Sequence, residues 1–214
     1  MIVVRKRKAH ECPVPRLSSS PRRPPERGRL ARSWCTINMG SRPHIYVERH
    51  KGYSRDLPLA WVTEREKMHV FRSMIINEQI ECVWQAVRAF DRVAAWNPGV
   101  DEAVLESGEP TATGTIRSLQ IPDGTLFRET LLAHSDHEHF YTYDILESPL
   151  PVTNYISTHR FIPVTHSGQT LSIWEADFGC ASDVANEMDN VVGDAIFING
   201  MTSLNQYLKE IRDG

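Results

Sequence analysis

Apolar and polar residues alternate over most of the chain beyond residue 68, and this alternation predicts β-strands. Neighbouring side chains of a strand point to opposite faces, so each alternating run places its apolar residues on one face. Turn residues separate the runs at the spacing of antiparallel hairpins. The predicted strands cover residues 69–77, 100–108, 114–121, 125–134, 139–147, 154–164 and 170–180.

Two other segments carry apolar residues at helical spacing. We expect Asn77 to cap a first helix over residues 78–90. A shorter helix or turn is expected over 93–96, because the breakers at 97–99 follow it. This region therefore connects the first strand to the remaining six.

The last predicted helix begins at Ser182, as its cap, and continues to about Ile211 with an apolar stripe along one side. Gly193 and Gly200 lie inside it, at a cost of roughly 1 kcal/mol each relative to alanine. They predict a close backbone approach or a kink. The element order predicts an α+β fold, in which a strongly curved antiparallel sheet wraps around this helix and leaves a ligand-sized hollow.

One predicted hairpin carries two opposite charges on its more apolar face. The turn signal at 122–124 pairs Leu119 with Phe127 and Arg117 with Glu129. Inward charges are costly unless they are paired, and they often mark a site. Two interpretations remain: a functional pair, or a structural or exposed ion pair. A register slip of one residue would separate the charges. The apolar face holds Thr115, Arg117, Leu119, Ile121, Phe127, Glu129, Leu131 and Ala133.

The following strands add aromatic and polar candidates. A hairpin turn at 167–168 is predicted to pair Phe161 with Trp174, with Ala176 and Phe178 on the same side. These side chains either line a cavity or form ordinary core. His159 is either a structural histidine whose ring nitrogens are hydrogen-bonded within the sheet, or a catalytic base. The candidate ligand-binding residues are Leu119, Phe127, Leu131, Tyr141, Tyr143, Tyr155, His159, Phe161 and Trp174.

Charge divides the chain into two unlike parts. Residues 1–67 contain 16 Lys and Arg against 6 Asp and Glu, whereas residues 68–214 contain 8 against 21. The second part is long enough for a sizeable core, so we assign it to one folded domain. The first is rich in proline, arginine and serine, which is typical of disorder. Three interpretations of this part remain. It is a dispensable or mis-annotated extension, in which case Met39 or Met68 is the true start, or it is a targeting peptide. In the third interpretation, it is a basic tail that binds nucleic acid or directs nuclear import.

Several classes of function lack their usual signals. The four cysteines show no C-x-x-C spacing, which suggests neither a disulfide framework nor a zinc site, and a reducing compartment fits best. His134, His137 and His139 fall on a hairpin tip, where their spacing does not converge on a metal. No apolar run approaches the ~18 residues that span a bilayer. We expect a cytoplasmic protein without metal or cofactor, whose folded domain binds no nucleic acid.

Motifs along residues 68–214 resemble the START/Bet v 1-like (SRPBCC) superfamily, specifically its polyketide cyclase/dehydrase and lipid-transport branch. Their order and spacing are more specific than any one of them. This resemblance implies a helix-grip fold. The motifs are V-W-x-x-V at 83–87, D-x-x-x-x-W-N-P at 91–98, G-T-I-R at 114–117, R-E-T-L at 128–131, Y-x-Y-x-I at 141–145, the Trp–Phe strand at 174–178 and G-M-x-x-L at 200–204.

The resemblance also implies where the site lies. Plant lachrymatory-factor synthase and the abscisic-acid receptors are similar in placing an Arg on the third strand and a Glu on the fourth, which Arg117 and Glu129 match. The receptors' gating loops would correspond to 122–125 and 149–154, but these loops depart from the receptor pattern. Hormone sensing is therefore not predicted.

The sequence leaves three hypotheses for function. In the first, Glu129 is a general acid-base and Arg117 holds an enolate or carboxylate oxygen, for cyclisation, dehydration or isomerisation of a hydrophobic carbonyl compound. In the second, the same pair anchors a polyketide or lipid without catalysis. In the third, the acidic surface of 68–214 binds a protein partner. No phosphate-binding loop or Ser-His-Asp arrangement is evident, and the oligomeric state is left open.

Overall fold

The computed structural model describes residues 65–214. The expectations for the basic tail and its alternative start sites fall on residues 1–64 and therefore lie outside the described part. The first strand, β1, begins at Arg65 and so includes the last three residues that the sequence boundary assigned to the tail. Within residues 65–214, no helix is long and apolar enough to cross a membrane.

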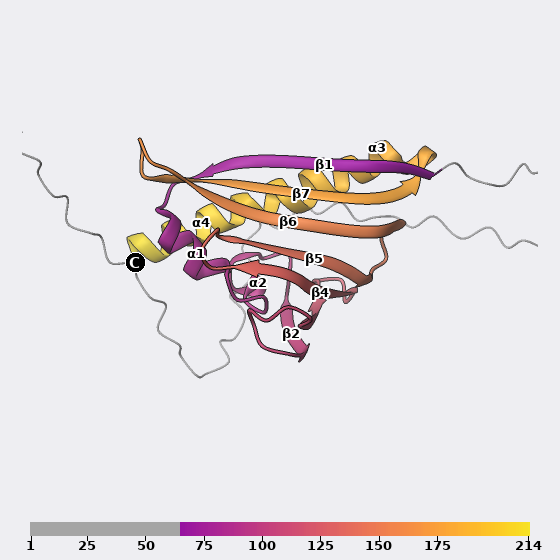
Figure 1. Ribbon diagram of the computed structural model, residues 1–214, viewed down its shortest axis with the longest axis horizontal. Helices are drawn as coiled ribbons and strands as arrows, with labels where there is room; N and C mark the ends of the chain where they lie inside the picture. Colours follow the sequence, from indigo (N-terminus) through magenta and orange to yellow (C-terminus); the bar gives the residue numbers. More distant parts are fainter. Residues whose placement is uncertain (1–64) are drawn as a thin grey trace, which may run out of the picture. The chain divides into compact units, whose positions relative to one another are not determined.

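Seven strands form one antiparallel sheet in the order β1-β7-β6-β5-β4-β3-β2 (Figure 1). Only β1 is out of sequence order, because it pairs with the last strand along its entire length. The strands are β1 (Arg65–Ile76), β2 (Glu102–Ser107), β3 (Ile116–Gln120), β4 (Leu126–Ser135), β5 (Phe140–Glu147), β6 (Val152–Val164) and β7 (Gln169–Ala181).

Two short helices, α1 (Ile80–Val87) and α2 (Val93–Trp96), connect β1 to β2. The predicted cap at Asn77 is wrong, since Gln79 occupies the N-cap position and the Asn77 amide instead binds the side chain of Asn205 at 2.9 Å. The helix also ends three residues before Phe90, where the sequence pattern had ended it.

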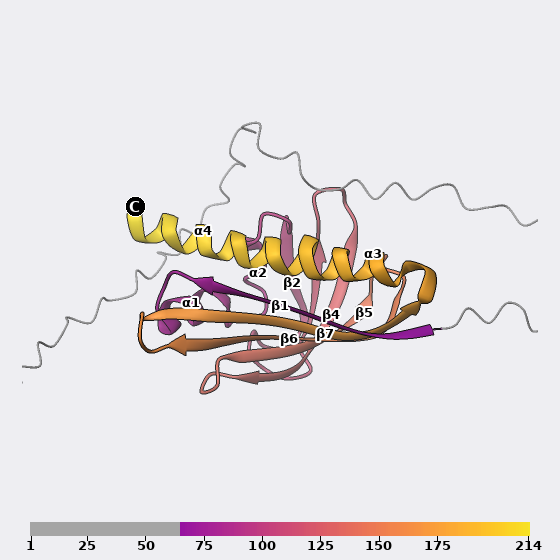
Figure 2. The same cartoon turned by 90° about the horizontal axis from the view of Figure 1, so that it is seen from above.

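The C-terminal helix changes its winding along its length. It begins with a 3₁₀ turn, η1 (Ser182–Val184), so Ser182 is its first residue rather than its cap. It then continues through α3 (Ala185–Asp189), the π-helical η2 (Asn190–Ile198) and α4 (Asn199–Asp213). Figure 2 shows this helix lying along one face of the sheet. The predicted α+β helix-grip arrangement is confirmed.

Both glycines of the helix mark close approaches, as predicted. A Cβ on Gly200 would lie 2.8 Å from Cζ3 of Trp174 on β7, and one on Gly193 would lie 2.5 Å from the guanidinium of Arg72 on β1. Arg72 in turn binds Asp189 and Asp194, each at 2.9 Å. The helix backbone therefore closely approaches side chains of β1 at Gly193 and of β7 at Gly200.

The register of the β3–β4 hairpin agrees with the prediction. Arg117 pairs with Glu129, and Leu119 pairs with Phe127. Further along β4 the prediction fails, because a bulge makes Leu132 an extra residue between Leu131 and Ala133. Ala133 therefore leaves the inner face, and His134 takes its place there.

The register of the β6–β7 hairpin differs from the prediction by two residues. The Gly168 amide bonds the Val164 carbonyl, and Val164 pairs with Gln169, so the loop has four residues rather than two. Phe161 consequently lies opposite Ser172, and His159 lies opposite Trp174. A shift of two preserves the face of every side chain, so all of these residues still point inward.

Candidate functional site

The Arg117–Glu129 pair lies on the inner face of the sheet and is nearly inaccessible, with each residue 5% exposed. Nε of Arg117 donates to Oε2 of Glu129 at 2.7 Å, and Nη2 lies 2.6 Å from the same oxygen. The position of each side chain follows from strand alternation and the hairpin register. The alternative that this pair is solvent-exposed is therefore wrong.

Phe90, which sequence reasoning did not select, completes the environment of Arg117. Its carbonyl oxygen accepts a hydrogen bond from Nη1, and its ring centroid lies 3.7 Å from the guanidinium carbon. The ring of Tyr143 lies 5.6 Å from the same carbon. The carbonyl of Phe90 is free to accept this bond because α1 ends at Val87. The helical spacing of apolar residues had extended the helix to Phe90, so this role could not be predicted from the sequence.

Burial and charge act on Glu129 in opposite directions. Loss of solvent raises the pKa of the Glu129 carboxyl above its ordinary value, whereas the charge and hydrogen bonds of Arg117 lower it. The nearby carboxylate of Asp144 raises this pKa further. The net direction is upward, so Glu129 takes up a proton more readily than a carboxyl group in water.

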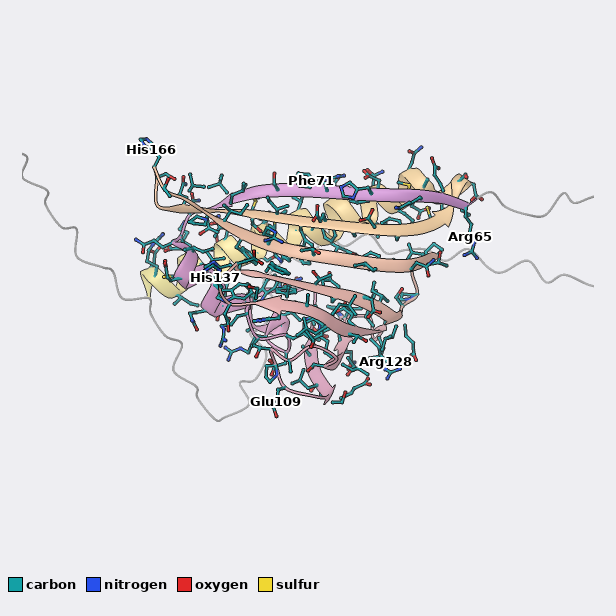
Figure 3. The ribbon with its side chains drawn as sticks, viewed as in Figure 1. Arg65, Phe71, Glu109, Arg128, His137 and His166 are labelled. Atoms are coloured by element: carbon teal, nitrogen blue, oxygen red, sulfur yellow. The ribbon has the colours of Figure 1, made fainter. Side chains whose placement is uncertain are left out.

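The adjacent residue, Arg128, shows how completely strand alternation separates the two faces. Arg128 projects at the outside of the sheet (Figure 3) and binds Glu106 at 2.6 Å and Glu147 at 2.8 Å. These side chains are about one-third to two-thirds exposed. Two arginine–carboxylate clusters thus lie one residue apart, one solvated and one buried.

A second group on the inner face is centred on His159. Its ring stacks on Trp174 at 4.1 Å between centroids, and Trp174 stacks on Phe197 of η2 at 4.7 Å. Nε2 of His159 lies 2.8 Å from the Ser172 hydroxyl, and Nδ1 lies 3.3 Å from the Tyr141 hydroxyl. Burial lowers the pKa of His159 to about 3, so the imidazole remains neutral.

A third group joins β5, β6 and β7 around Ser157. The Ser157 hydroxyl donates to the Glu175 carbonyl at 2.8 Å and accepts from Nε1 of Trp174 at 3.1 Å. Tyr143 lies directly across from Ser157, and Tyr155 lies two residues before it on the same face. Burial raises the pKa of both phenols, and hydrogen bonding with Ser157 partly opposes this rise.

All nine candidate ligand-binding residues lie on the inner face, but they do not converge on one point. Tyr143 joins the ion pair, while Tyr141, Phe161 and Trp174 surround His159. Leu119, Phe127 and Leu131 belong to the core or pack against it. The strand pattern had indicated the face, whereas Phe90, Phe197, Ser157 and Ser172 were missed because their roles depend on tertiary contacts.

A pocket of about 550 Å³ opens at the end of β5 and β6. It has the size of a small-molecule site. Tyr155 is the candidate residue that lines it, and Ile145, the cross-strand partner of Glu129, lines it as well. Neither charged residue of the ion pair is among the lining residues, which are Leu126, Ile145, Leu146, Glu147, Ser148, Leu150, Val152, Asn154 and Tyr155.

The three histidines of the β4–β5 hairpin have other contacts. Nε2 of His134 lies 2.9 Å from the Arg88 carbonyl, and the rings of His134 and His139 both pack on Trp84. His137 lies exposed at the tip (Figure 3). Residues 65–214 contain no group of three or more His, Cys, Asp or Glu placed to hold a metal ion.

The comparisons with known proteins agree with this architecture. A family model described as "Polyketide cyclase / dehydrase and lipid transport" matches residues 67–209. The protein XoxI of Bacillus cereus is 31% identical, with a TM-score of 0.61, and the match covers 67% of this chain and 97% of that one. An uncharacterised protein of Bacillus thuringiensis is 32% identical, with a TM-score of 0.61 and coverages of 66% and 99%.

A more distant structure shares the fold alone. A point mutant of Thalictrum norcoclaurine synthase, solved with a transition-state analogue, is 10% identical with a TM-score of 0.56. The match covers 70% of this chain and 98% of the synthase. No curated protein matches the chain. The match to the polyketide cyclase/dehydrase and lipid-transport branch inferred from the motifs is confirmed.

Proposed function

Because this chain belongs to the polyketide cyclase/dehydrase and lipid-transport family, we propose that it binds a small hydrophobic ligand between the sheet and the C-terminal helix. The ligand class is a polyketide, a lipid or a related carbonyl compound. Its apolar skeleton contacts the inner faces of β3–β7. Its polar group lies near Arg117 and Glu129.

The buried ion pair is the observation that carries this proposal. Burying two charges costs several kcal/mol per ion before their attraction is counted, and apolar residues would fill the same space at no such cost. Arg117 has five N–H donors, of which the contacts to Glu129 and Phe90 use three. Two donors are left for a ligand oxygen.

The pocket at the end of β5 and β6 supports a route to this pair. Its volume of about 550 Å³ suits a small molecule, and Tyr155 forms part of its wall. The rings of Tyr155 and Tyr143 are 6.4 Å apart, and Tyr143 lies over the Arg117 guanidinium. A ligand that displaces these two rings moves from the pocket to the ion pair.

Native mass spectrometry of the purified full-length protein tests the proposal. We expect a bound fraction that is heavier by the mass of one small molecule and that loses this mass on organic extraction. Extracts with no hydrophobic compound, together with no uptake of added fatty acids or aromatic ketones, would contradict ligand binding. That outcome would favour the alternative of a partner-binding accessory protein.

Proton transfer by Glu129 is a second candidate function, favoured by the raised pKa of this carboxyl. As a base, Glu129 would take a proton from a carbon next to a carbonyl, and the C–H electron pair would become an enolate whose oxygen Arg117 binds. Returning the proton elsewhere completes an isomerisation. In a dehydration, the enolate electrons instead form the C=C bond, and the protonated Glu129 gives its proton to the departing β-hydroxyl group, which leaves as water.

Glu129→Gln separates the two candidates. If Glu129 transfers protons, exchange of α-hydrogens of a bound ketone with D₂O falls by at least about 100-fold, since general acid–base catalysis contributes roughly 10²–10⁴-fold. If the ion pair only anchors the ligand, the rate of hydrogen exchange in the bound ketone is unchanged in the variant, and only the affinity for the ketone falls. Glu138→Gln, in the exposed β4–β5 turn, is the matched control and exchanges like the parent protein.

A further inference from the structure

Hydrogen-bond donors gather on the inner face between the pocket and the ion pair. Tyr143 and Ser157 are a direct cross-strand pair, and Tyr155 is a diagonal neighbour on the same face. The two tyrosines are each 4% exposed, and Ser157 is fully buried. Nε1 of Trp174 reaches the same serine from β7. Three donors, one each from β5, β6 and β7, therefore lie around the Ser157 oxygen.

The acceptors inside this cluster are few and weak. The Ser157 proton is committed to the Glu175 carbonyl, and one lone pair of its oxygen accepts from Trp174. One lone pair is left for two phenols that both interact with Ser157. The two phenols also interact with each other, so the oxygen of one is an acceptor for the other. A charged oxygen accepts hydrogen bonds about twice as strong as a neutral one does.

Both phenols of the cluster are protonated and can donate a hydrogen bond. Burial keeps both phenols protonated, so each retains its O–H as a donor. The charge of Glu129 also raises the pKa of both phenols, whereas Arg117, which is bound to Glu129, lowers the pKa of Tyr143. Tyr155 also lines the pocket of about 550 Å³, which gives a small molecule access to the cluster.

We propose that Tyr143 and Tyr155 form an oxyanion site, which binds the single charged oxygen of a phenolate or enolate whose apolar skeleton lies in the adjoining pocket. The phenols turn from Ser157 to the ligand oxygen, while Ser157 keeps its bonds to Glu175 and Trp174. This site rests on the proposed function and narrows its ligands to compounds with an acidic enol or phenol. In that arrangement Arg117 stays with Glu129.

Two probes of matched shape test the site in the full-length protein. 4-Nitrophenol ionises, and its phenolate absorbs at longer wavelength, whereas 4-nitroanisole has the same skeleton without an ionisable oxygen. We expect the phenolate to bind at least tenfold more tightly than the anisole. Tyr143→Phe and Tyr155→Phe each weaken phenolate binding by about tenfold or more, because each removes one bond to a charged oxygen.

Anisole binding checks that the pocket is intact in these variants, and it is expected to stay within twofold of the parent. Tyr207→Phe, a partly buried tyrosine on α4 outside the cluster, is the matched control and leaves both probes unaffected. Unchanged phenolate binding in both Tyr→Phe variants, with anisole still bound, would overturn the oxyanion site and leave the proposed function standing. Failure of the parent protein to bind either probe would overturn both.

Discussion

At the scale of single residues, the Arg117–Glu129 pair is tolerated because each partner satisfies the other. Removing either side chain would destabilise the fold, since the charge of the other would remain buried on the inner face of the sheet without a partner. Arg117 does not fully offset the effect of burial on Glu129, because the pKa of this carboxyl is still raised. The pair is thus weak evidence for stability and stronger evidence for a site.

Replacing one partner of the pair measures this dependence. Arg117→Met leaves Glu129 buried without its cation, so we expect the free energy of unfolding to fall by about 3–5 kcal/mol. Arg117→Met with Glu129→Leu removes both charges and recovers most of that loss. Urea denaturation at pH 7 gives both values. Arg128→Met, which breaks the solvated cluster one residue away, is the matched control and has a much smaller effect. Equal losses in the single and double variants would contradict the account.

His159 gives a dependence of stability on pH. Its native pKa of about 3 lies below its unfolded value of 6.5, so between these values the unfolded state binds a proton that the native state does not. Stability due to this group therefore falls as pH decreases below 6.5, by about 1 kcal/mol between pH 6.5 and 5.5. We expect His159→Gln to lose this part of the slope in urea titrations at the two pH values. His137→Gln, at the exposed hairpin tip, retains it; equal slopes in His159→Gln and the parent protein would refute the assignment.

At the scale of secondary-structure elements, the C-terminal helix is shaped by what it packs against. Gly200 lies against the edge of the Trp174 ring, and this ring stacks on both His159 and Phe197. Phe197 belongs to the π-helical η2, and such windings frequently occur at functional sites. The helix thus meets the His159 group through one aromatic stack.

Gly200→Ala distinguishes packing from helix propensity. Propensity alone favours alanine by about 1 kcal/mol, whereas a methyl group 2.8 Å from the Trp174 ring overpacks the core at a cost of roughly 1–3 kcal/mol. We expect a net loss of stability in thermal unfolding. Gly193→Ala has a smaller effect, because its methyl group meets the movable guanidinium of Arg72. A higher melting temperature for Gly200→Ala would show that the close approach is relieved in solution.

The hairpins show which parts of the architecture were predictable. The β3–β4 register followed from a turn whose proline and glycine define its length, so Arg117 and Glu129 were paired correctly. The β6–β7 loop has a glycine but no residue that defines where it begins, and its register was wrong by two. The bulge at Leu132 has no local signature in the sequence, so the inward position of His134 was missed.

At the scale of the whole described region, alternation and helical periodicity were sufficient for the order of elements and for the inner face of each strand. They were not sufficient for the site, since its members meet through tertiary contacts. Phe90 reaches Arg117 from the segment between α1 and α2, and Phe197 reaches Trp174 from the last helix. Such contacts depend on where elements end and how they cross, which periodicity does not specify.

The central claim is that a small hydrophobic molecule binds to the inner face of the sheet. Neighbouring leucines on β4 report the two faces separately, because Leu131 is fully buried on the inner face and Leu132 is 41% exposed at the bulge. The direct measurement is a set of intermolecular NOEs between 4-nitroanisole and the full-length protein labelled at its leucine methyl groups. The account predicts NOEs to Leu131 and Leu119 of the inner face, together with NOEs to the pocket leucines Leu126, Leu146 and Leu150, and none to Leu132. NOEs to Leu132 without any to Leu131 or Leu119 would contradict it.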